Sequence, residues 1–160
     1  MSFEVAVCYV DNAGRRTADR INGQPCIEIG IAWDSEAGEA RILHPRSVET
    51  VVGLIDTGAQ GILADEALIS RHRMPWTREM NSRTGNANSR TRGHVCQLHF
   101  PKHDWTTRQE VFSSPLRAQG NPYDLLLGRV FLQSCEFEWT SGGISSVRFV
   151  TPTDPLKDAS

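Results

Sequence analysis

An all-β fold is the class that this 160-residue sequence predicts. Short apolar segments with alternating side chains recur along the chain, and turn-forming residues separate them. Only two segments show a helical pattern instead. Many short strands joined by turns are typical of a β-sandwich or a β-barrel, and the residues alone leave both architectures open.

The clearest strand pattern is in the sequence CIEIGIAW, where Ile27, Ile29 and Ile31 alternate on one face. The last two expected strands flank the turn sequence TSGG and therefore predict a hairpin. An apolar run at residues 125–127 predicts a further short strand. In all, the expected strands cover residues 3–10, 26–33, 39–44, 48–55, 93–100, 108–114, 125–127, 135–139 and 144–150.

The two helical patterns are short. One covers residues 64–72 and would turn Leu68 and Ile69 inward, and the other covers residues 128–135. Between them, the segment 75–93 is polar and rich in arginine and asparagine, which predicts a long exposed hairpin or loop.

Composition and charge describe an ordinary globular chain. The sequence predicts one domain over residues 1–150, followed by a flexible tail at 151–160. A net charge of −2 offers no electrostatic argument for binding nucleic acid or an anionic membrane. No segment has the pattern of a signal peptide or of a transmembrane helix. The four cysteines are scattered, which favours free thiols in a reducing cytoplasm, so we expect a cytoplasmic protein.

The sequence GLIDTGA places Asp56 at the end of an apolar strand, where a charged side chain is seldom found without a purpose. Gly58 permits a tight turn after it, and turn amides can hold the carboxylate while its outer oxygen stays free for water. Thr57 can donate a hydrogen bond to the backbone or across an interface. An Asx-turn at a strand end is the simpler interpretation of the same residues.

A second motif, YDLLLGRVFL at residues 123–132, favours a functional role for Asp56 over a simple Asx-turn. Together with LIDTGA, it resembles the retropepsin-like aspartic proteases, and the resemblance extends from about Ile21 to Phe149. It implies a small closed barrel of the acid-protease type with one or two short helices. The residues that match the two motifs are Asp56 as the catalytic residue and Thr57, Gly58, Ala59, Gly128 and Arg129 as its support.

The resemblance also implies an activity and a partner. Aspartic proteases use two carboxylates that share one proton, and this chain has a single Asp-Thr-Gly, so we expect a homodimer that hydrolyses extended peptide or protein substrates. The resemblance implies no cofactor. It also implies a hairpin flap over the substrate, for which Thr84, Gly85, Asn86 and Ala87 are the candidates.

The chain departs from the family's pattern in two places. Where viral members often carry acidic residues after the first motif, this chain has Gln60, Gly61 and Ile62, which leaves Asp124, Glu136 or a second subunit to pair with Arg129. The N-terminal strands in residues 1–33 also extend the minimal fold. The last two strands could form a dimer interface or cover the core of their own subunit.

These departures keep two other functions open. One is a catalytically weak or inactive module of the same fold that binds peptides or dimerises. The other is an unrelated, monomeric β-sandwich in which the tripeptide is a coincidence. A metal site built from His94, Cys96, His99 and His103 with Asp104 is not expected, because alternation along a strand would turn His99 away from the first two.

Overall fold

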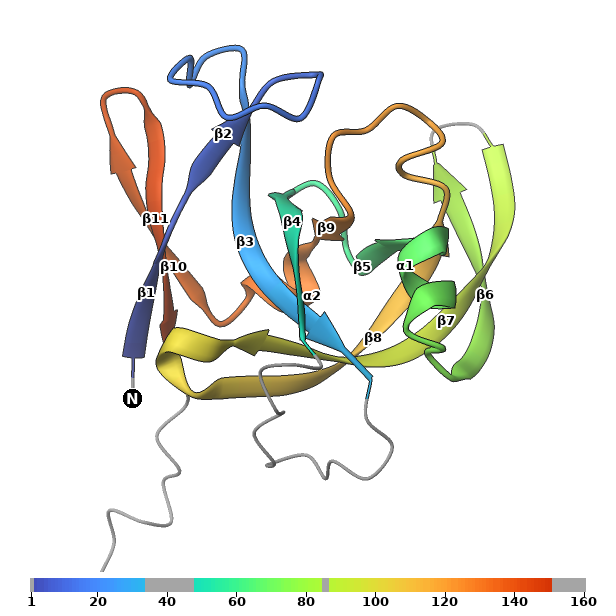
Figure 1. Ribbon diagram of the computed structural model, residues 1–160. Coiled ribbons are helices and arrows are strands. Elements are labelled where there is room, and N and C mark those ends of the chain that lie inside the picture. The colour runs from blue at the N-terminus through green and yellow to red at the C-terminus, as the bar shows by residue number, and fades with distance from the viewer. Residues whose placement is uncertain (1, 34–47, 85–86, 151–160) are drawn as a thin grey trace, which may run out of the picture.

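The computed structural model of the protein describes residues 2–33, 48–84 and 87–150. Six of its strands close into a barrel in the order β3-β4-β9-β5-β8-β7, because β3 pairs with both β4 and β7 (Figure 1). β2 and β6 extend the same sheet. The barrel strands are β3 (Gln24–Ala32), β4 (Glu49–Ile55), β5 (Ile62–Asp65), β7 (Ala87–Phe100), β8 (Trp105–Ser114) and β9 (Leu125–Leu127), and the added strands are β2 (Cys8–Val10) and β6 (Trp76–Thr84). The prediction of a closed all-β barrel is confirmed.

Helices are short in the structure. α1 (Glu66–Arg71) begins after Asp65, whose carboxylate accepts a hydrogen bond from the amide of Ala67 (3.2 Å) and so caps the helix. α2 (Arg129–Leu132) follows Gly128, and η2 (Pro101–His103) is a single 3₁₀ turn. Within the described ranges, no helix is long and apolar enough to cross a bilayer.

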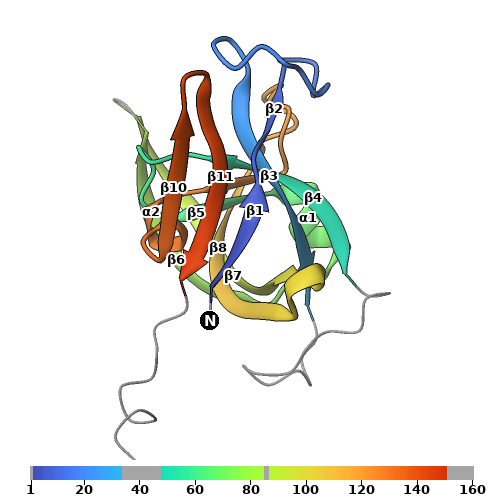
Figure 2. The same ribbon diagram turned by 90° about the vertical axis from the view of Figure 1, so that its left-hand side faces the viewer.

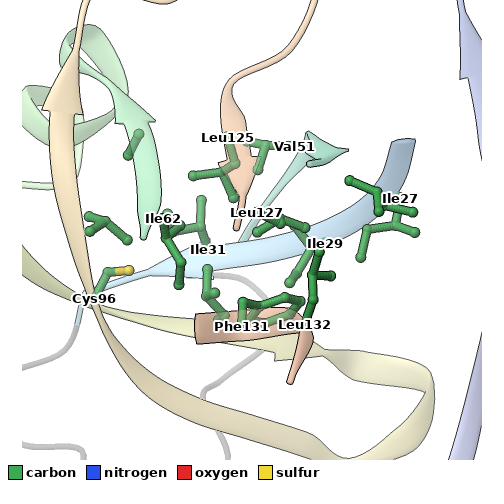
Figure 3. Close-up of a cluster of buried hydrophobic side chains, with 14 of the residues drawn as sticks. Ile27, Ile29, Ile31, Val51, Ile62, Cys96, Leu125, Leu127, Phe131 and Leu132 are labelled. Atoms are coloured by element: carbon green, nitrogen blue, oxygen red, sulfur yellow. The ribbon is translucent and has the colours of Figure 1, made fainter. Parts of the chain in front are cut away.

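The barrel is filled by the inward-facing side chains of its strands (Figure 3). Ile27, Ile29 and Ile31 are each at most 1% exposed, which confirms the alternation expected for their strand. Leu125 and Leu127 from β9 are fully buried beside them, and α2 adds Phe131 and Leu132 to the same cluster. The strand that carries the second motif therefore runs through the core.

A second sheet lies against the barrel, with the strand order β1-β11-β10 (Figure 2). Its strands are β1 (Ser2–Ala6), β10 (Cys135–Thr140) and β11 (Gly143–Val150). Phe149 of β11 is 3% exposed and packs on Phe3 (ring centroids 5.0 Å apart) and Phe100 (4.9 Å). The predicted final hairpin is thus present, and it covers the core of its own chain.

Several boundaries differ from those predicted. The strand expected at 3–10 is divided at Val7, because the chain leaves the β1 sheet there to join β3 in the barrel. The sequence at 62–65 forms β5 where a helix was expected to begin. The segment 75–93, expected to be a hairpin or loop, does form part of the hairpin of β6 and β7. The strand expected at 39–44 and the tail at 151–160 lie outside the described residues.

Candidate active site

The two sequence motifs meet in the sheet. β4 ends at Ile55, directly before Asp56, and β9 lies beside it (Figure 1). The two strands pair in parallel, with Ile55 opposite Leu127. Gly53 allows this contact to be close, because a Cβ there would lie 2.9 Å from the side chain of Leu127. The amide of Asp56 donates a hydrogen bond to the carbonyl of Leu127 (3.1 Å). The backbone of Asp56 is therefore attached to the second motif.

The carboxylate of Asp56 is held on one side. Its Oδ1 accepts hydrogen bonds from the amides of Gly58 (2.8 Å) and Ala59 (3.2 Å). Its Oδ2 accepts none from the part of the chain that the structure describes. The side chain is half-buried, so one oxygen is fixed by the turn and the other remains accessible to a water molecule or a substrate. The same geometry satisfies the definition of an Asx-turn.

The residues after Asp56 form the surface of the loop. Thr57 and Gly58 are exposed, and Ala59 is half-buried. A methyl group at Gly58 would lie 3.1 Å from Oδ1 of Asp56, so a larger residue there would crowd the carboxylate. Because Thr57 is exposed, its side chain lies at the protein surface beside Asp56.

The start of α2 supports this loop from the other side. The amides of Arg129 and Val130 donate hydrogen bonds to the carbonyls of Ala59 and Gln60, both 2.9 Å, which satisfies helix-end amides that would otherwise lack acceptors. A Cβ at Gly128 would lie 2.1 Å from the carbonyl oxygen of Gly61. Gly128 is therefore required where the two segments cross.

The side chain of Arg129 is exposed and has no partner among the residues that the structure describes. Asp124 binds Arg117 instead, at 2.9 and 3.0 Å. Glu136 lies 3.8 Å from Arg148. Neither of the carboxylates suggested by the sequence pairs with Arg129 in this chain.

Asp65, Arg117 and Asp124 form a brace that the sequence analysis missed. The amide of Arg117 donates to Oδ1 of Asp65 (2.8 Å), while its guanidinium binds Asp124. The backbone of Asp124 in turn accepts from the amide of Asp65 and donates to the carbonyl of Val52, both 2.9 Å. The only local signal was Asp65 near the start of the helical pattern at residues 64–72, where an aspartate is typical of an N-cap.

The flap candidates lie at the tip of the hairpin formed by β6 and β7. Thr84 and Ala87 are register partners in that hairpin, and Gly85 and Asn86 lie outside the described residues. The base of the hairpin is anchored to β8, since Arg78 and Thr77 both donate hydrogen bonds to the carboxylate of Glu110.

The histidines and cysteine considered as metal ligands have separate contacts. The ring of His94 lies 3.0 Å from the carbonyl of Met74, and that of His99 contacts the hydroxyl of Thr106. His103 stacks on Phe3, and Cys96 is fully buried. Over residues 2–33, 48–84 and 87–150, no three His, Cys, Asp or Glu side chains are grouped as metal ligands.

No family model and no curated protein matches this sequence. The fold, however, is similar to that of a retropepsin-like aspartic protease from Rickettsia conorii, with a TM-score of 0.55 and 13% identity, over 93% of this chain and 92% of that chain. EIAV protease in complex with the inhibitor HBY-793 aligns with a TM-score of 0.46 and 15% identity, over 71% of this chain and 88% of its own. The chain thus has a retropepsin-like fold, as its two motifs indicated.

Proposed function

We propose that the protein is an aspartic endopeptidase that is active as a homodimer. The observation that carries this proposal is the state of the Asp56 carboxylate. One oxygen is fixed by the amides of Gly58 and Ala59, and the other is left accessible at the end of a core strand. The fold supports the proposal, because it is similar to that of a solved retropepsin-like aspartic protease.

The proposed chemistry needs a second copy of the chain. Two carboxylates about 3 Å apart cannot both ionise, so they share one proton. The ionised member takes a proton from water as the water attacks the scissile carbonyl, and the protonated member donates a hydrogen bond to the carbonyl oxygen. Each chain supplies one Asp-Thr-Gly, so a two-fold axis beside Thr57 brings the two Asp56 side chains together.

The rest of the site has supporting roles in this proposal. Thr57, Gly58 and Ala59 hold the acid, while Gly128 and Arg129 support the loop from below. The hairpin tip from Thr84 to Ala87, including Gly85 and Asn86, covers an extended peptide and binds it through backbone hydrogen bonds.

The test is cleavage of a mixed peptide library by wild type and by Asp56→Asn, from about pH 3 to about pH 8. Asp104→Asn is the matched control, since Asp104 is exposed, directly follows η2, and has a left-handed backbone that asparagine tolerates. We expect a bell-shaped acidic profile that belongs to the pair of carboxylates and vanishes in Asp56→Asn. Sedimentation should show dimers for all three proteins.

A peptide-binding module without turnover is the second candidate. The side chain of Arg129 favours it, since it is exposed and has no partner within residues 2–33, 48–84 and 87–150. A loop without an ion pair at that position would position water less well. Intact dimers that bind extended peptides but do not cleave them, in wild type and variant alike, would select this function. A monomeric protein would contradict both candidates.

A further inference from the structure

A cavity of about 410 Å³ opens on the outside of the barrel, between residues of β1, β3 and η2. From β4 it includes Thr50, near the start of that strand, whereas Asp56 follows the opposite end. Val5, Val7 and Phe100 form its apolar wall. The cavity is therefore separate from the candidate active site.

The cavity exists because the edge of β3 changes partner. β3 pairs with β2 as far as Cys26 and with β7 from Gly30 onward. Glu28 lies between these two pairings and lines the cavity. The chain segment that would otherwise continue beside β3 has left the barrel to form β1 in the second sheet.

Two thiols lie where β1 and β3 diverge. Cys8 and Cys26 are directly opposite in the antiparallel pair of β2 and β3, so their side chains share one face. Opposed residues have Cα atoms about 4.5–5.5 Å apart, which is inside the range that a disulfide spans. Cys8 is half-buried and lines the cavity, whereas Cys26 is fully buried. A reagent in the cavity therefore reaches Cys8 first.

The electrostatics around the two thiols agree with this proximity. Burial, and to a smaller extent the neighbouring Cys8, raises the pKa of Cys26 to about 12. Burial also raises the pKa of Cys8, and the nearby Arg16 opposes that shift. Glu28, which pairs with Arg16, adds to the rise in the pKa of Cys8.

The rim of the cavity is cationic. Arg16 pairs with Glu28, so its charge is largely balanced, but Lys102 is exposed and His103 lies next to it. A small ligand with carboxylates would be attracted to this rim. An apolar wall, a cationic rim and an accessible thiol together fit a peptide-sized anionic disulfide.

We propose that Cys8 is a site of reversible modification by anionic low-molecular-mass disulfides, and that Cys26 resolves the adduct into a Cys8–Cys26 disulfide. In the first step, the Cys8 thiolate attacks one sulfur of the reagent, the S–S bond of the reagent breaks, and one thiol leaves with the proton that Cys8 lost. In the second step, Cys26 loses its proton and attacks Sγ of Cys8, and the second thiol leaves. Two cysteines are oxidised and one disulfide is reduced to two thiols.

The Cys8–Cys26 disulfide would be reversible and not a permanent structural bond. The Cβ atoms of opposed residues are about 4.5–5.5 Å apart, wider than the roughly 3.8 Å of a relaxed disulfide. Closing the bond draws β2 and β3 together at the mouth of the cavity. Excess thiol would reduce this bond by the same exchange in reverse.

The experiment uses oxidised glutathione as the probe, with intact mass and peptide mapping as the readouts. In wild type we expect a glutathionyl adduct on Cys8, followed by a Cys8–Cys26 link with loss of two hydrogens. Cys26→Ala should stop at the adduct, and Cys8→Ser should gain none. Cys135→Ser is the matched control, since Cys135 is equally half-buried but lies on β10, and it should behave as wild type.

Three results would overturn the proposal: modification mainly at Cys96 or Cys135, an unchanged rate in Cys8→Ser, or four free thiols in wild type after prolonged exposure. If Cys26→Ala does not fold, peptide mapping of wild type alone decides the linkage. Lys102→Ala tests the charge requirement. It should react several-fold more slowly with oxidised glutathione and at the wild-type rate with neutral hydroxyethyl disulfide, whereas equal slowing or none would refute the role of the rim.

Discussion

The amide of Asp56 donates a hydrogen bond to the carbonyl oxygen of Leu127 (3.1 Å), so the acid of the first motif is attached to the strand of the second. Leu127 is fully buried, and Gly128 after it passes directly beneath the loop that follows Asp56. The position of the carboxylate therefore depends on packing in the core as well as on the turn that contains it. Substitutions in the second motif should therefore shift the carboxylate of Asp56, even though they leave Asp56 itself unchanged.

Gly128→Ala tests this dependence. Its methyl group would lie 2.1 Å from the carbonyl oxygen of Gly61 and 2.9 Å from that of Ala59, and both are backbone atoms that cannot rotate away. We expect a loss of at least about 1–3 kcal/mol in the free energy of unfolding, measured by denaturant titration, together with loss of any peptidase activity.

Gly61→Ala is the control for that variant. Its added Cβ would meet the ring of Phe112 at 3.5 Å, an ordinary van der Waals contact. A Gly128→Ala protein as stable as Gly61→Ala would show that the two segments do not cross as closely as described.

Removing the side chain of Arg117 should loosen β9 against β4 and β5. Its guanidinium binds both oxygens of Asp124, which is partly buried, at 2.9 and 3.0 Å. We expect Arg117→Ala to lower the free energy of unfolding by about 0.5–1 kcal/mol, because one partner is well exposed. Arg15→Ala removes a solvent-exposed pair with Asp11 and should produce no measurable change. Equal effects of the two substitutions would argue against the brace.

Glu49 should make the stability of the fold depend on pH in the acidic range. Hydrogen bonds from Arg71 and then from His72 hold the pKa of Glu49 below its ordinary value of 4.5, although burial opposes them. A lowered carboxyl pKa stabilises the folded state above the unfolded pKa, and this stabilisation disappears as the pH falls through the folded value. The melting temperature of wild type should exceed that of Glu49→Gln near neutral pH, and the difference should shrink below pH 4.5. A constant difference across that range would exclude this ion pair as its cause.

Phe149 should be among the costliest residues to truncate. It is 3% exposed and joins the second sheet to the barrel through Phe100 of β7 and Phe131 of α2, while it also packs on Phe3 of its own sheet. We expect Phe149→Ala to cost about 3–5 kcal/mol in thermal or denaturant unfolding. Trp139 on the neighbouring strand is 69% exposed, so Trp139→Ala should stay within about 0.5 kcal/mol of wild type.

Arg129→Ala addresses the proposed dimer. Because this guanidinium has no partner within the described chain, its removal should leave the unfolding of dilute, monomeric protein unchanged. If a carboxylate of the second subunit binds it, the dimer dissociation constant measured by sedimentation should rise at least about tenfold. Arg148→Ala is the control, since Arg148 has Glu136 as a neighbour in its own chain. An unchanged dissociation constant would remove Arg129 from the interface.

Short stretches of the sequence predict part of this architecture. The alternation of Ile27, Ile29 and Ile31 follows from the two-residue period of a strand with one buried face, and α1 follows from apolar residues at helical spacing behind a capping Asp65. The hairpin β6–β7 was harder to delimit. Its first strand, with the sequence WTREMNSRT, is mostly exposed where its side chains are described, so it has little alternation to detect.

Local sequence was sufficient for the class of fold and for the tight turn at Asp56, because strand period and turn chemistry depend on neighbours along the chain. The pairing of Ile55 with Leu127, the crossing at Gly128 and the alignment of Cys8 with Cys26 join residues far apart in the sequence. Such contacts depend on which strands become neighbours when the barrel closes, and no short-range pattern encodes that choice. Within the described residues the side chain of Arg129 has no partner for a reason of the same kind, since Asp124, one of its candidate partners, binds Arg117.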